Sequence, residues 1–418
     1  MHHFHYHAGA LHAEDASLAE IAAAVGTPVY VYSQATLERH YRVFAAALAP
    51  LDPLIAFAAK ANGAVGVLRV LARLGAGADV VSAGEIERAL AAGVPPGRIV
   101  FSGVGKTEAE LAYALAQGVS QINVESPAEL ALLEQVAAGA DTPAPVALRI
   151  NPDVGAGANA KITTGAAASK FGVSLADAPA LYARAAASPH LRPVGLAVHI
   201  GSQIEDLSPL ERAFGLLRGL GESLRGQGLP LERLDLGGGL GVPYASGAEP
   251  PPPEAYAQTV LRCFAGFPAR FVFEPGRLIA ANAGVLLTRV VRVQERPDRR
   301  ILVLDAGMND LLRPSLYGAH HALWAVREGV GARQADLVGP ICETGDTFAA
   351  GVDAPDLQPG DLACFMSAGA YGASMSSSYN ARALVPEVLV SGGRFAVIRR
   401  RIETRDLLAF ETAPAWLR

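Results

Sequence analysis

Residues 54–63 read LIAFAAKANG, in which six apolar residues in succession end on a lysine and a glycine-containing turn. Unbroken apolarity of this kind is typical of a strand that is buried on both faces of a parallel sheet. Seven further runs share this texture, and Ala/Leu/Glu-rich helical segments separate them. Eight such units predict a (β/α)8 TIM-type barrel, with a doubly wound sheet as the structural alternative. The seven other runs are residues 78–83, 98–103, 121–126, 146–152, 195–202, 233–239 and 270–276.

All eight runs end in polar residues or glycines on their carboxyl side. In a barrel these positions share one rim, and barrel enzymes keep their active sites at that rim. The sequence therefore predicts a catalytic site there. The rim residues are Lys60, Asp79, Ser82, Ser102, Glu125, Ser126, Arg149, Asn151, His199, Ser202, Gly237 to Gly239, Glu274 and Arg277.

The pattern of alternating apolar runs and helical segments ends at about residue 280. Short β-type runs such as GVLLTRVVRV and RRILVLDAG follow one another without long helices between them. A length of 418 residues favours two domains. We therefore expect an N-terminal segment, residues 1–26, that packs with the β domain, a barrel over residues 27–280, and a C-terminal β-rich domain over residues 281–418.

Composition excludes several classes of protein. No uncharged apolar stretch approaches the roughly 18 residues of a membrane span. The net charge of −5 and a pI near 6.1 give no electrostatic footprint for nucleic acid. Three widely spaced cysteines argue against a disulfide framework, and the opening MHHFHYH lacks the apolar region of a signal peptide. We expect a cytoplasmic protein without a metal site.

Lysine is rare in this chain. Only four of the 35 Lys and Arg residues are lysines, and one of them is Lys60. A lysine can lose its proton and attack as a neutral amine, which an arginine cannot do. Lys60 is therefore a candidate nucleophile, although a lysine that caps a strand end is the plain alternative.

Two other segments invite a phosphate-binding interpretation. FSGVGKT (101–107) lacks the first glycine of a P-loop, because Val100 stands there, so a structural turn with Lys106 near the rim is the better interpretation. DLGGGLG (235–241) places glycines directly after a strand, and Ser202 on the neighbouring strand adds a hydroxyl group. This pair of strand ends predicts a phosphate site.

Glu274 and His199 add a carboxylate and an imidazole to the amine and the phosphate site. Glu274 is either an ion-pair partner or a carboxylate that keeps a pyridine nitrogen protonated, and His199 is either a core histidine or a ring-stacking partner. An amine, a phosphate site, an imidazole and a carboxylate are together the parts of a pyridoxal phosphate site. Cys342, beside Glu343, is either a small buried hydrophobe or an acid that protonates a carbanion.

The chain as a whole resembles the diaminopimelate decarboxylase family, from about Phe4 to the C-terminus and in matching order. The family uses pyridoxal 5'-phosphate and has the barrel and the β domain expected above. The motifs that carry the resemblance are KAN (60–62), DVVSAGE (79–85), FSGVGKT, INVES (122–126), RINPD (149–153), KITTG (161–165), SKFGV (169–173), HIGSQ (199–203), GGGLG (237–241), EPGR (274–277), CETGD (342–346) and GAYGASMSSSYN (369–380).

The resemblance assigns roles residue by residue. Lys60, His199 and Cys342 match catalytic residues: the lysine that holds the cofactor, the imidazole on its ring and the proton donor. The residues that match cofactor-binding positions are Lys60, His199, Ser202, Gly239, Glu274, Pro275, Gly276, Arg277 and Tyr371. Those that match substrate-binding positions are Arg277, Arg313, Tyr317, Glu343 and Tyr371.

The resemblance also implies the reaction and the assembly. It implies decarboxylation of meso-2,6-diaminopimelate to L-lysine and CO2, the last step of lysine biosynthesis, in a homodimer whose active sites are shared between subunits. An ornithine or arginine decarboxylase shares the fold, but CETGD and MSSSYN fit the diaminopimelate branch better. An alanine racemase needs a tyrosine base whose motif is missing from this sequence. A non-catalytic pyridoxal phosphate-binding regulator is the alternative from another class.

Overall fold

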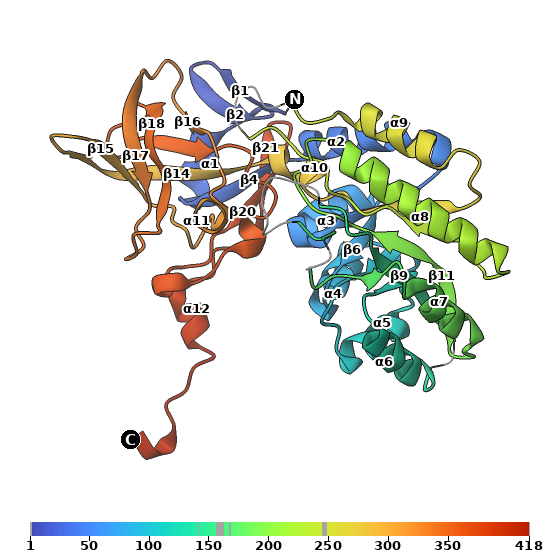
Figure 1. Cartoon of the computed structure of the whole chain (residues 1–418). Helices are drawn as coiled ribbons and strands as arrows, with labels where there is room; N and C mark the ends of the chain where they lie inside the picture. The colour runs from blue at the N-terminus through green and yellow to red at the C-terminus, as the bar shows by residue number, and fades with distance from the viewer. Residues whose placement is uncertain (1, 141, 156–162, 167–168, 245–248, 418) are drawn as a thin grey trace. The chain divides into compact units, whose positions relative to one another are not determined.

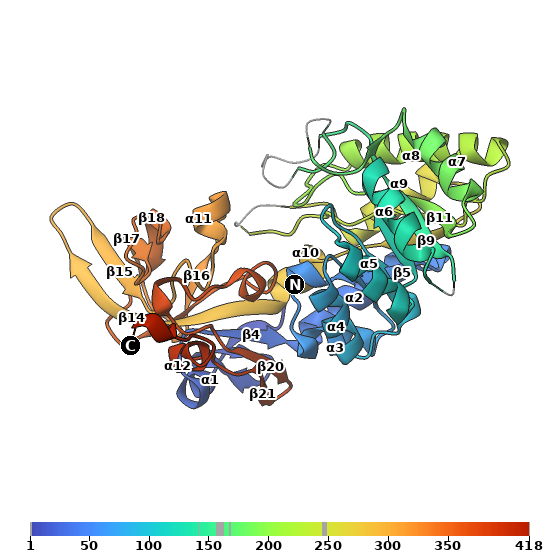
Figure 2. The ribbon, with the colours of Figure 1, turned by 90° about the horizontal axis from the view of Figure 1, so that it is seen from below.

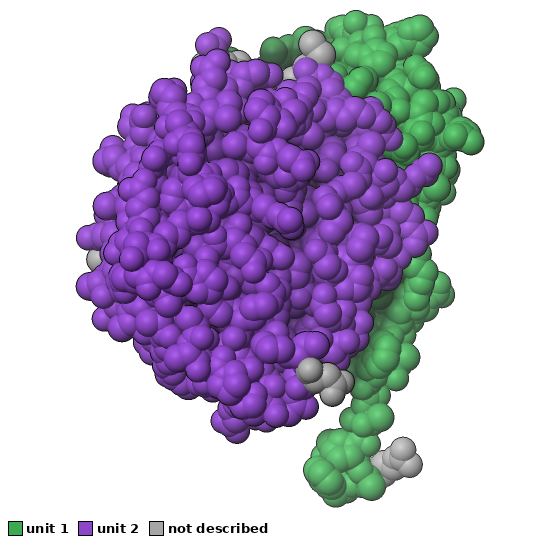
Figure 3. Space-filling model, turned by 90° about the vertical axis from the view of Figure 1, so that its right-hand side faces the viewer, with its two compact units in different colours: residues 1–37, 244–246, 280–418 green, residues 38–243, 247–279 purple. Residues whose placement is uncertain are grey.

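The computed structural model describes residues 2–140, 142–155, 163–166, 169–244 and 249–417. The chain forms two compact units, coloured separately in Figure 3. The barrel unit comprises residues 38–243 and 247–279, and the β unit comprises residues 1–37, 244–246 and 280–418. Each unit is described by itself.

The barrel unit is built on eight parallel strands that close on themselves. The strand order is β9, β11, β12, β13, β5, β6, β7, β8, and β8 pairs again with β9. The short strand β10 (Val173–Ser174) pairs in parallel with the last two residues of β9, Ile150 and Asn151. The predicted barrel is therefore confirmed. Its strands are β5 (Leu54–Ala58), β6 (Gly77–Val80), β7 (Ile99–Phe101), β8 (Gln121–Val124), β9 (Ala144–Asn151), β11 (Leu191–Val198), β12 (Arg233–Asp235) and β13 (Arg270–Phe273).

These strands form because almost every one of their residues is buried, as the unbroken apolar runs predicted. Helices surround them on the outside of the barrel, as Figures 1 and 2 show. The helices are α2 (Gln34–Leu48), α3 (Val65–Ala72), α4 (Ala83–Ala91), α5 (Glu108–Gln117), α6 (Pro127–Ala137), α7 (Ala178–Ala187), α8 (Ser208–Gly226), α9 (Pro253–Cys263) and α10 (Arg277–Ala280).

The β unit contains a nine-stranded sheet and a three-stranded one. The long path of the large sheet runs β18, β17, β15, β14, β4, β20, β21, and β16 and β19 pair beside it. The predicted β-rich domain is therefore confirmed. Its strands are β1 (Phe4–His7), β2 (Ala10–Ala13), β3 (Ala16–Ser17), β4 (Val29–Ser33), β14 (Gly284–Glu295), β15 (Arg300–Leu304), β16 (Leu323–Ala325), β17 (Ala332–Val338), β18 (Thr347–Pro355), β19 (Leu362–Phe365), β20 (Glu387–Ser391) and β21 (Arg394–Arg399), with helices α1 (Leu18–Val25), α11 (Arg313–Tyr317) and α12 (Thr404–Leu408).

The position of β4 differs from the expected division of the chain. The sequence analysis began the barrel at residue 27, but residues 29–33 form β4 within the sheet of the β unit. This strand pairs antiparallel with β14 and parallel with β20. All five of its residues are buried, because the sheet covers both its edges and the apolar core of this unit packs against its valines.

The described part of the chain includes no helix that is both long enough and apolar enough to cross a membrane.

The start of α5 gives a test of the fold. The Thr107 hydroxyl accepts a hydrogen bond from the Glu110 amide at 3.3 Å, and the Glu110 carboxylate accepts one from the Thr107 amide at 3.1 Å. Replacing such a capping threonine by alanine costs about 1 kcal/mol. We expect Thr107→Ala to lower the thermal unfolding midpoint, and Thr107→Ser to keep it, since serine retains the oxygen. Equal midpoints in both variants would show that the cap does not contribute.

Candidate active site

A cavity of about 170 Å³ opens among the carboxyl ends of the barrel strands. Side chains from several consecutive strands and from the loops that follow them line it, so residues distant in the chain meet there. Its polar lining consists of Lys60, Ser102, Asn123, Arg149, Thr164, His199, Asp235 and Glu274. A cavity therefore lies at the rim where the site was predicted, and Lys60, His199 and Glu274 all line it.

Lys60 stands in a short 3-10 turn directly after β5. Its Nζ donates a hydrogen bond to Asp79 Oδ2 at 2.5 Å. Asp79 lies near the end of β6, at the same rim of the barrel. The Asp79 side chain is fully buried, whereas that of Lys60 is 36% exposed toward the cavity. The lysine is therefore the counter-charge of a buried carboxylate. Sequence analysis placed Asp79 at the rim but did not find this role.

Glu274 follows β13 and points into a buried polar network. The Asn123 amide donates to Asp235 Oδ2 at 3.3 Å and lies 3.5 Å from Glu274 Oε1, and the Gln121 amide donates to Asp235 at 2.9 Å. Burial, followed by the charges of Asp235 and Asp79, raises the pKa of Glu274 well above its usual value. Burial also raises the pKa of Asp235, to about 6. In the protein alone, Glu274 therefore keeps its proton to a higher pH than an ordinary glutamate does.

His199 is neutral in this environment. Burial lowers its pKa well below the usual value, and the charges of Arg149 and Lys60 lower it further. The Gly238 amide donates to His199 Nδ1 at 3.3 Å, which places the ring hydrogen on Nε2. Arg149, which shares this part of the cavity, is held by Glu125 through two contacts of 3.1 Å. An uncharged imidazole face is therefore available to a flat aromatic ring.

The turn after β12 lets the backbone approach closely. A Cβ atom at Gly239, whose φ is +117°, would lie 2.5 Å from the Gly201 carbonyl oxygen, so only glycine fits there. Within the described residues, the amides of Gly239 and Gly276 donate no hydrogen bond. Arg277 donates to the Ser202 hydroxyl from Nε at 3.2 Å and from Nη2 at 3.0 Å. Two unpaired amides, a hydroxyl and a guanidinium are donors that suit a phosphate group.

Lys106 is excluded from the chemistry of the site. Its side chain is fully buried, and Nζ donates to Glu129 at 2.6 Å and to the Asn123 carbonyl at 2.7 Å. The interpretation of FSGVGKT as a structural turn is therefore confirmed. Lys161, the third lysine, lies outside the described residues. The described residues hold no group of three or more His, Cys, Asp or Glu side chains suited to a metal ion.

The remaining predicted residues belong to the β unit. Arg313 begins α11 and is buried. Its Nη1 lies 2.6 Å from His321 Nε2, and its guanidinium stacks on the ring of Tyr244 at 4.4 Å. His321 Nδ1 lies 2.9 Å from the Met366 carbonyl oxygen, so the imidazole donates at Nδ1 and accepts from Arg313 at Nε2. His321, which sequence analysis missed, therefore fixes the orientation of Arg313. Tyr317, the last residue of α11, is partly buried.

The CETGD loop presents its functional groups to solvent in the isolated chain. Cys342 and Glu343 are both exposed, so the interpretation of Cys342 as a buried hydrophobe is wrong. Buried Asp346 accepts hydrogen bonds from the amides of Met308 and Ile341, both at 2.6 Å, and thereby fixes the base of the loop.

Two contacts with the SSSYN segment hold the tip of this loop. The Cys342 amide donates to Asn380 at 2.9 Å, and the Tyr379 hydroxyl donates to Glu343 at 2.9 Å. Tyr371, at the start of the same motif region, adopts φ = 55°. The two motifs CETGD and MSSSYN therefore form one structure within the β unit.

Comparison with known proteins identifies the class to which this fold and site belong. Residues 34–281 match the family described as "Pyridoxal-dependent decarboxylase, pyridoxal binding domain". The diaminopimelate decarboxylase of Zymomonas mobilis is 49% identical over 98% of both chains, and that of Pseudomonas aeruginosa is 49% identical over 98% of both chains.

Solved structures of diaminopimelate decarboxylases also resemble this chain. Diaminopimelate decarboxylase from Helicobacter pylori, in complex with L-lysine, superposes with a TM-score of 0.91 at 39% identity, covering 94% of this chain and 98% of that one. The enzyme from M. jannaschii with L-lysine gives a TM-score of 0.95 at 32% identity, covering 99% of each chain. The chain is a pyridoxal phosphate-dependent decarboxylase by class. It belongs to the diaminopimelate decarboxylase family.

The raised pKa of Glu274 predicts a pH dependence of stability. Because the folded, cofactor-free chain holds this proton more tightly than an ordinary glutamate with a pKa of 4.5, it binds more protons than the unfolded chain above that pH. This contribution is complete below pH 4.5 and is lost as the pH rises toward the folded pKa. We expect the urea midpoint of the cofactor-free protein to fall as the pH rises above about 4.5.

The matched variants separate Glu274 from other titrating groups. Glu274→Gln carries a neutral amide at every pH, so its urea midpoint should depend less on pH than that of the wild type. Glu254→Gln, at an exposed position in the first turn of α9, should keep the wild-type slope. Parallel curves for all three proteins would contradict a protonated Glu274.

Proposed function

We propose that this chain removes CO2 from meso-2,6-diaminopimelate, at its D-configured end, to give L-lysine. One observation carries the proposal: relatives that share nearly half of all residues over nearly the whole length are diaminopimelate decarboxylases. Solved relatives bound to L-lysine support the nature of the product. The reaction is the last step of lysine biosynthesis, and we place it in the cytoplasm.

The barrel residues fit pyridoxal phosphate. Lys60 would hold its aldehyde carbon, and Glu274 would face its ring nitrogen while the neutral His199 covers the ring. Ser202, Gly239 and the backbone of Glu274 to Arg277 would hold the phosphate. The Ser202 hydroxyl and the amides of Gly239 and Gly276, which donate no hydrogen bond within the described residues, form a donor set for an anion. When bound, the cofactor supplies an electron sink for the electron pair that the departing CO2 leaves behind.

The raised pKa of Glu274 bears on how this residue would interact with the cofactor ring. Burial and the neighbouring carboxylates raise the pKa of Glu274 in the network that it shares with Asp235. A positive charge on a protonated ring nitrogen would offset these effects, so Glu274 would face that nitrogen as its negative partner. Asn123 and Gln121, which donate to Asp235, keep the second carboxylate in place.

The other residues act on the substrate. Arg277 and Arg313 are cations that suit the substrate carboxylate, with Tyr317 and Tyr371 as neighbours of the same substrate. Glu343 would bind the distal ammonium group. Cys342 would donate its thiol proton to the carbon that loses CO2, and Lys60 would recover its attachment to the cofactor as product leaves.

We further propose a homodimer in which Cys342 and Glu343 act in the partner's site. Both residues are exposed in the isolated chain, which suits groups that complete a site on another subunit. The C-terminal segment also exposes large apolar side chains: Phe410 is 88% and Trp416 83% exposed. This segment extends beyond α12 in Figure 1. Apolar exposure on this scale is typical of a surface that another chain covers.

The alternatives receive less support. A lysine/ornithine decarboxylase from Vibrio vulnificus superposes at only 24% identity, which shows a shared fold alone. A non-catalytic pyridoxal phosphate carrier would not need an exposed thiol beside a carboxylate, and this chain has kept both with their loop contacts.

Release of CO2 tests the proposed reaction. Purified protein loaded with pyridoxal phosphate should release CO2 from meso-diaminopimelate and much less from ornithine, arginine or the LL isomer. Lys60→Ala and Lys60→Arg should abolish turnover and the visible absorbance of covalently held cofactor, because arginine stays protonated. Lys170→Ala should retain that absorbance. Release of CO2 from ornithine or arginine instead would overturn the proposed substrate.

Complementation between inactive variants tests the shared site. Lys60→Ala and Cys342→Ala, mixed in equal amounts under subunit exchange, should recover activity, since one site of each hybrid dimer has both residues intact. Random pairing makes about half the dimers hybrid, so roughly a quarter of wild-type activity is expected. If tagged chains exchange by mass measurement and activity stays at the level of the parents, the sites are not shared.

A further inference from the structure

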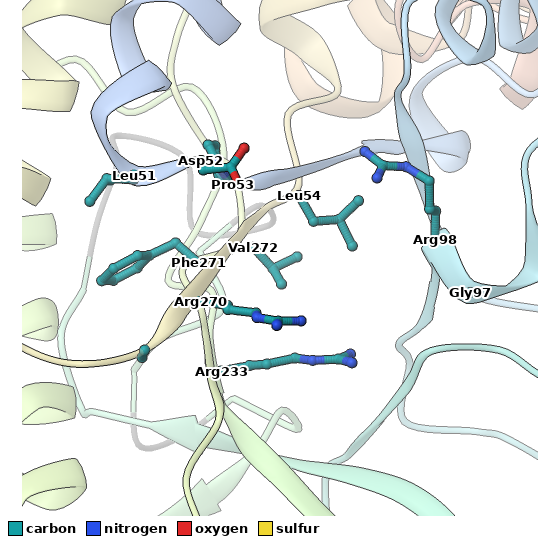
Figure 4. Close-up of a pocket in the computed structure, with 11 residues that line it drawn as sticks. Leu51, Asp52, Pro53, Leu54, Gly97, Arg98, Arg233, Arg270, Phe271 and Val272 are labelled. Atoms are coloured by element: carbon teal, nitrogen blue, oxygen red, sulfur yellow. The ribbon is translucent and has the colours of Figure 1, made fainter.

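A second cavity opens at the opposite end of the barrel, where the strands begin. Its volume is about 560 Å³, and it shares no lining residue with the cavity around Lys60. Three arginines line it from separate segments: Arg98 lies directly before β7, Arg233 begins β12 and Arg270 begins β13. Figure 4 shows the side chains of Arg233 and Arg270 lying next to each other, and that of Arg98 on the other side of Leu54.

These arginines use little of their hydrogen-bonding capacity. Arg98 Nη2 donates to the Gly75 carbonyl at 2.6 Å, and Arg233 Nη1 donates to the Ser120 carbonyl at 2.9 Å. The Nε atom of Arg98 is buried without a partner in the part of the chain that the structure describes. Arg270 is exposed at the mouth of the cavity, and its side chain forms no hydrogen bond with a described residue. The other N–H groups of Arg233 and Arg270 therefore remain available to a ligand.

The positive charge of this cavity is not balanced locally. Among the described residues, none of the three arginines forms an ion pair, and Asp52 is the one acidic residue in the lining. The carboxylates that act on Arg233 are engaged elsewhere: Glu232 pairs with Arg192 at 3.4 Å, and Asp235 belongs to the network around Glu274.

Burial and like charges both act on Arg233. Burial lowers its pKa, and Arg192 and Arg270 lower it further against the opposing effect of Glu232. The guanidinium groups of Arg233 and Arg270 therefore repel each other, and an anion bound in the cavity would relieve that repulsion.

We propose that this cavity binds a small organic anion that carries two or more phosphate or carboxylate groups. Guanidinium groups match the oxygens of both groups through paired hydrogen bonds. The volume falls within the usual range for small-molecule sites, and Leu54, Phe271 and Val272 provide an apolar wall for a carbon skeleton. The site is separate from the proposed catalytic function and does not depend on it.

Calorimetric titration of the holoenzyme tests the proposal with two probes, pyrophosphate and citrate. The protein is loaded with pyridoxal phosphate and saturated with L-lysine, so that anion sites at the catalytic end are filled. We expect one probe molecule to bind per chain, with affinity that falls as salt rises. Tighter binding of pyrophosphate would assign the ligand to the phosphates, and tighter binding of citrate to the carboxylates.

Two variants and a matched control locate the binding. Arg270→Gln and Arg233→Gln should each weaken binding by about tenfold, because each removes a charged hydrogen-bond donor. Arg262→Gln, on the exposed face of α9, should bind like the wild type. The Arg270 variant is expected to fold, since its side chain is exposed, and an unchanged unfolding midpoint without ligand checks this.

Two results would overturn the proposal. One is that neither probe binds the lysine-saturated holoenzyme. The other is that binding occurs but is unchanged in both Arg270→Gln and Arg233→Gln.

Discussion

The ion pair between Lys60 and Asp79 sets the electrostatics of the whole barrel mouth. Asp79, Asp235 and Glu274 bring three carboxyl groups into a space with little water, and the Lys60 ammonium group donates a hydrogen bond to Asp79. Burial acts against the ionisation of Glu274, and the charges of Asp235 and Asp79 add to that effect. The pKa of Glu274 is therefore raised well above its usual value, although Lys60 opposes the shift. Burial lowers the pKa of His199 well below its usual value, and the charges of Arg149 and of the same lysine lower it further. The shifted pKa values of Glu274 and His199, the two residues proposed to contact a pyridine ring, thus depend on burial and on the charges around them, including those of Lys60 and Asp79.

Much of the fold could be predicted from the sequence because the barrel strands are local signals. Each is an apolar run that ends at a polar rim, and each is followed by its own helix. Strand β4 carries a similar local signal, since VYVYS is a buried run that ends on a serine and is followed directly by α2. It nevertheless pairs with β14 and β20 in the other unit. Which sheet a strand joins depends here on partners more than two hundred residues away, and no local pattern encodes that choice.

The candidate site was predictable to a similar degree. Residue type and position at a strand end were enough to select Lys60, His199 and Glu274, which the structure brings to one cavity. Their partners were harder to find, because Asp79, Asp235 and Asn123 gain their roles from the register between strands. His321 is a further example: only the fold of the β unit places its ring between Arg313 and the Met366 carbonyl. Sequence reasoning finds reactive groups more easily than the groups that orient them.

The place of β4 has a consequence for the order in which the chain is synthesised. All eight barrel strands have been made once Phe273 is added, and each finds its neighbours among residues already present. By contrast, β4 is among the first strands made, yet β14 begins at Gly284 and β20 ends at Ser391. Buried residues of β4 must therefore wait for β14 before they gain a first neighbouring strand, and for β20 before their place in the sheet is complete. Protection of this early strand during translation is a task that the topology itself creates.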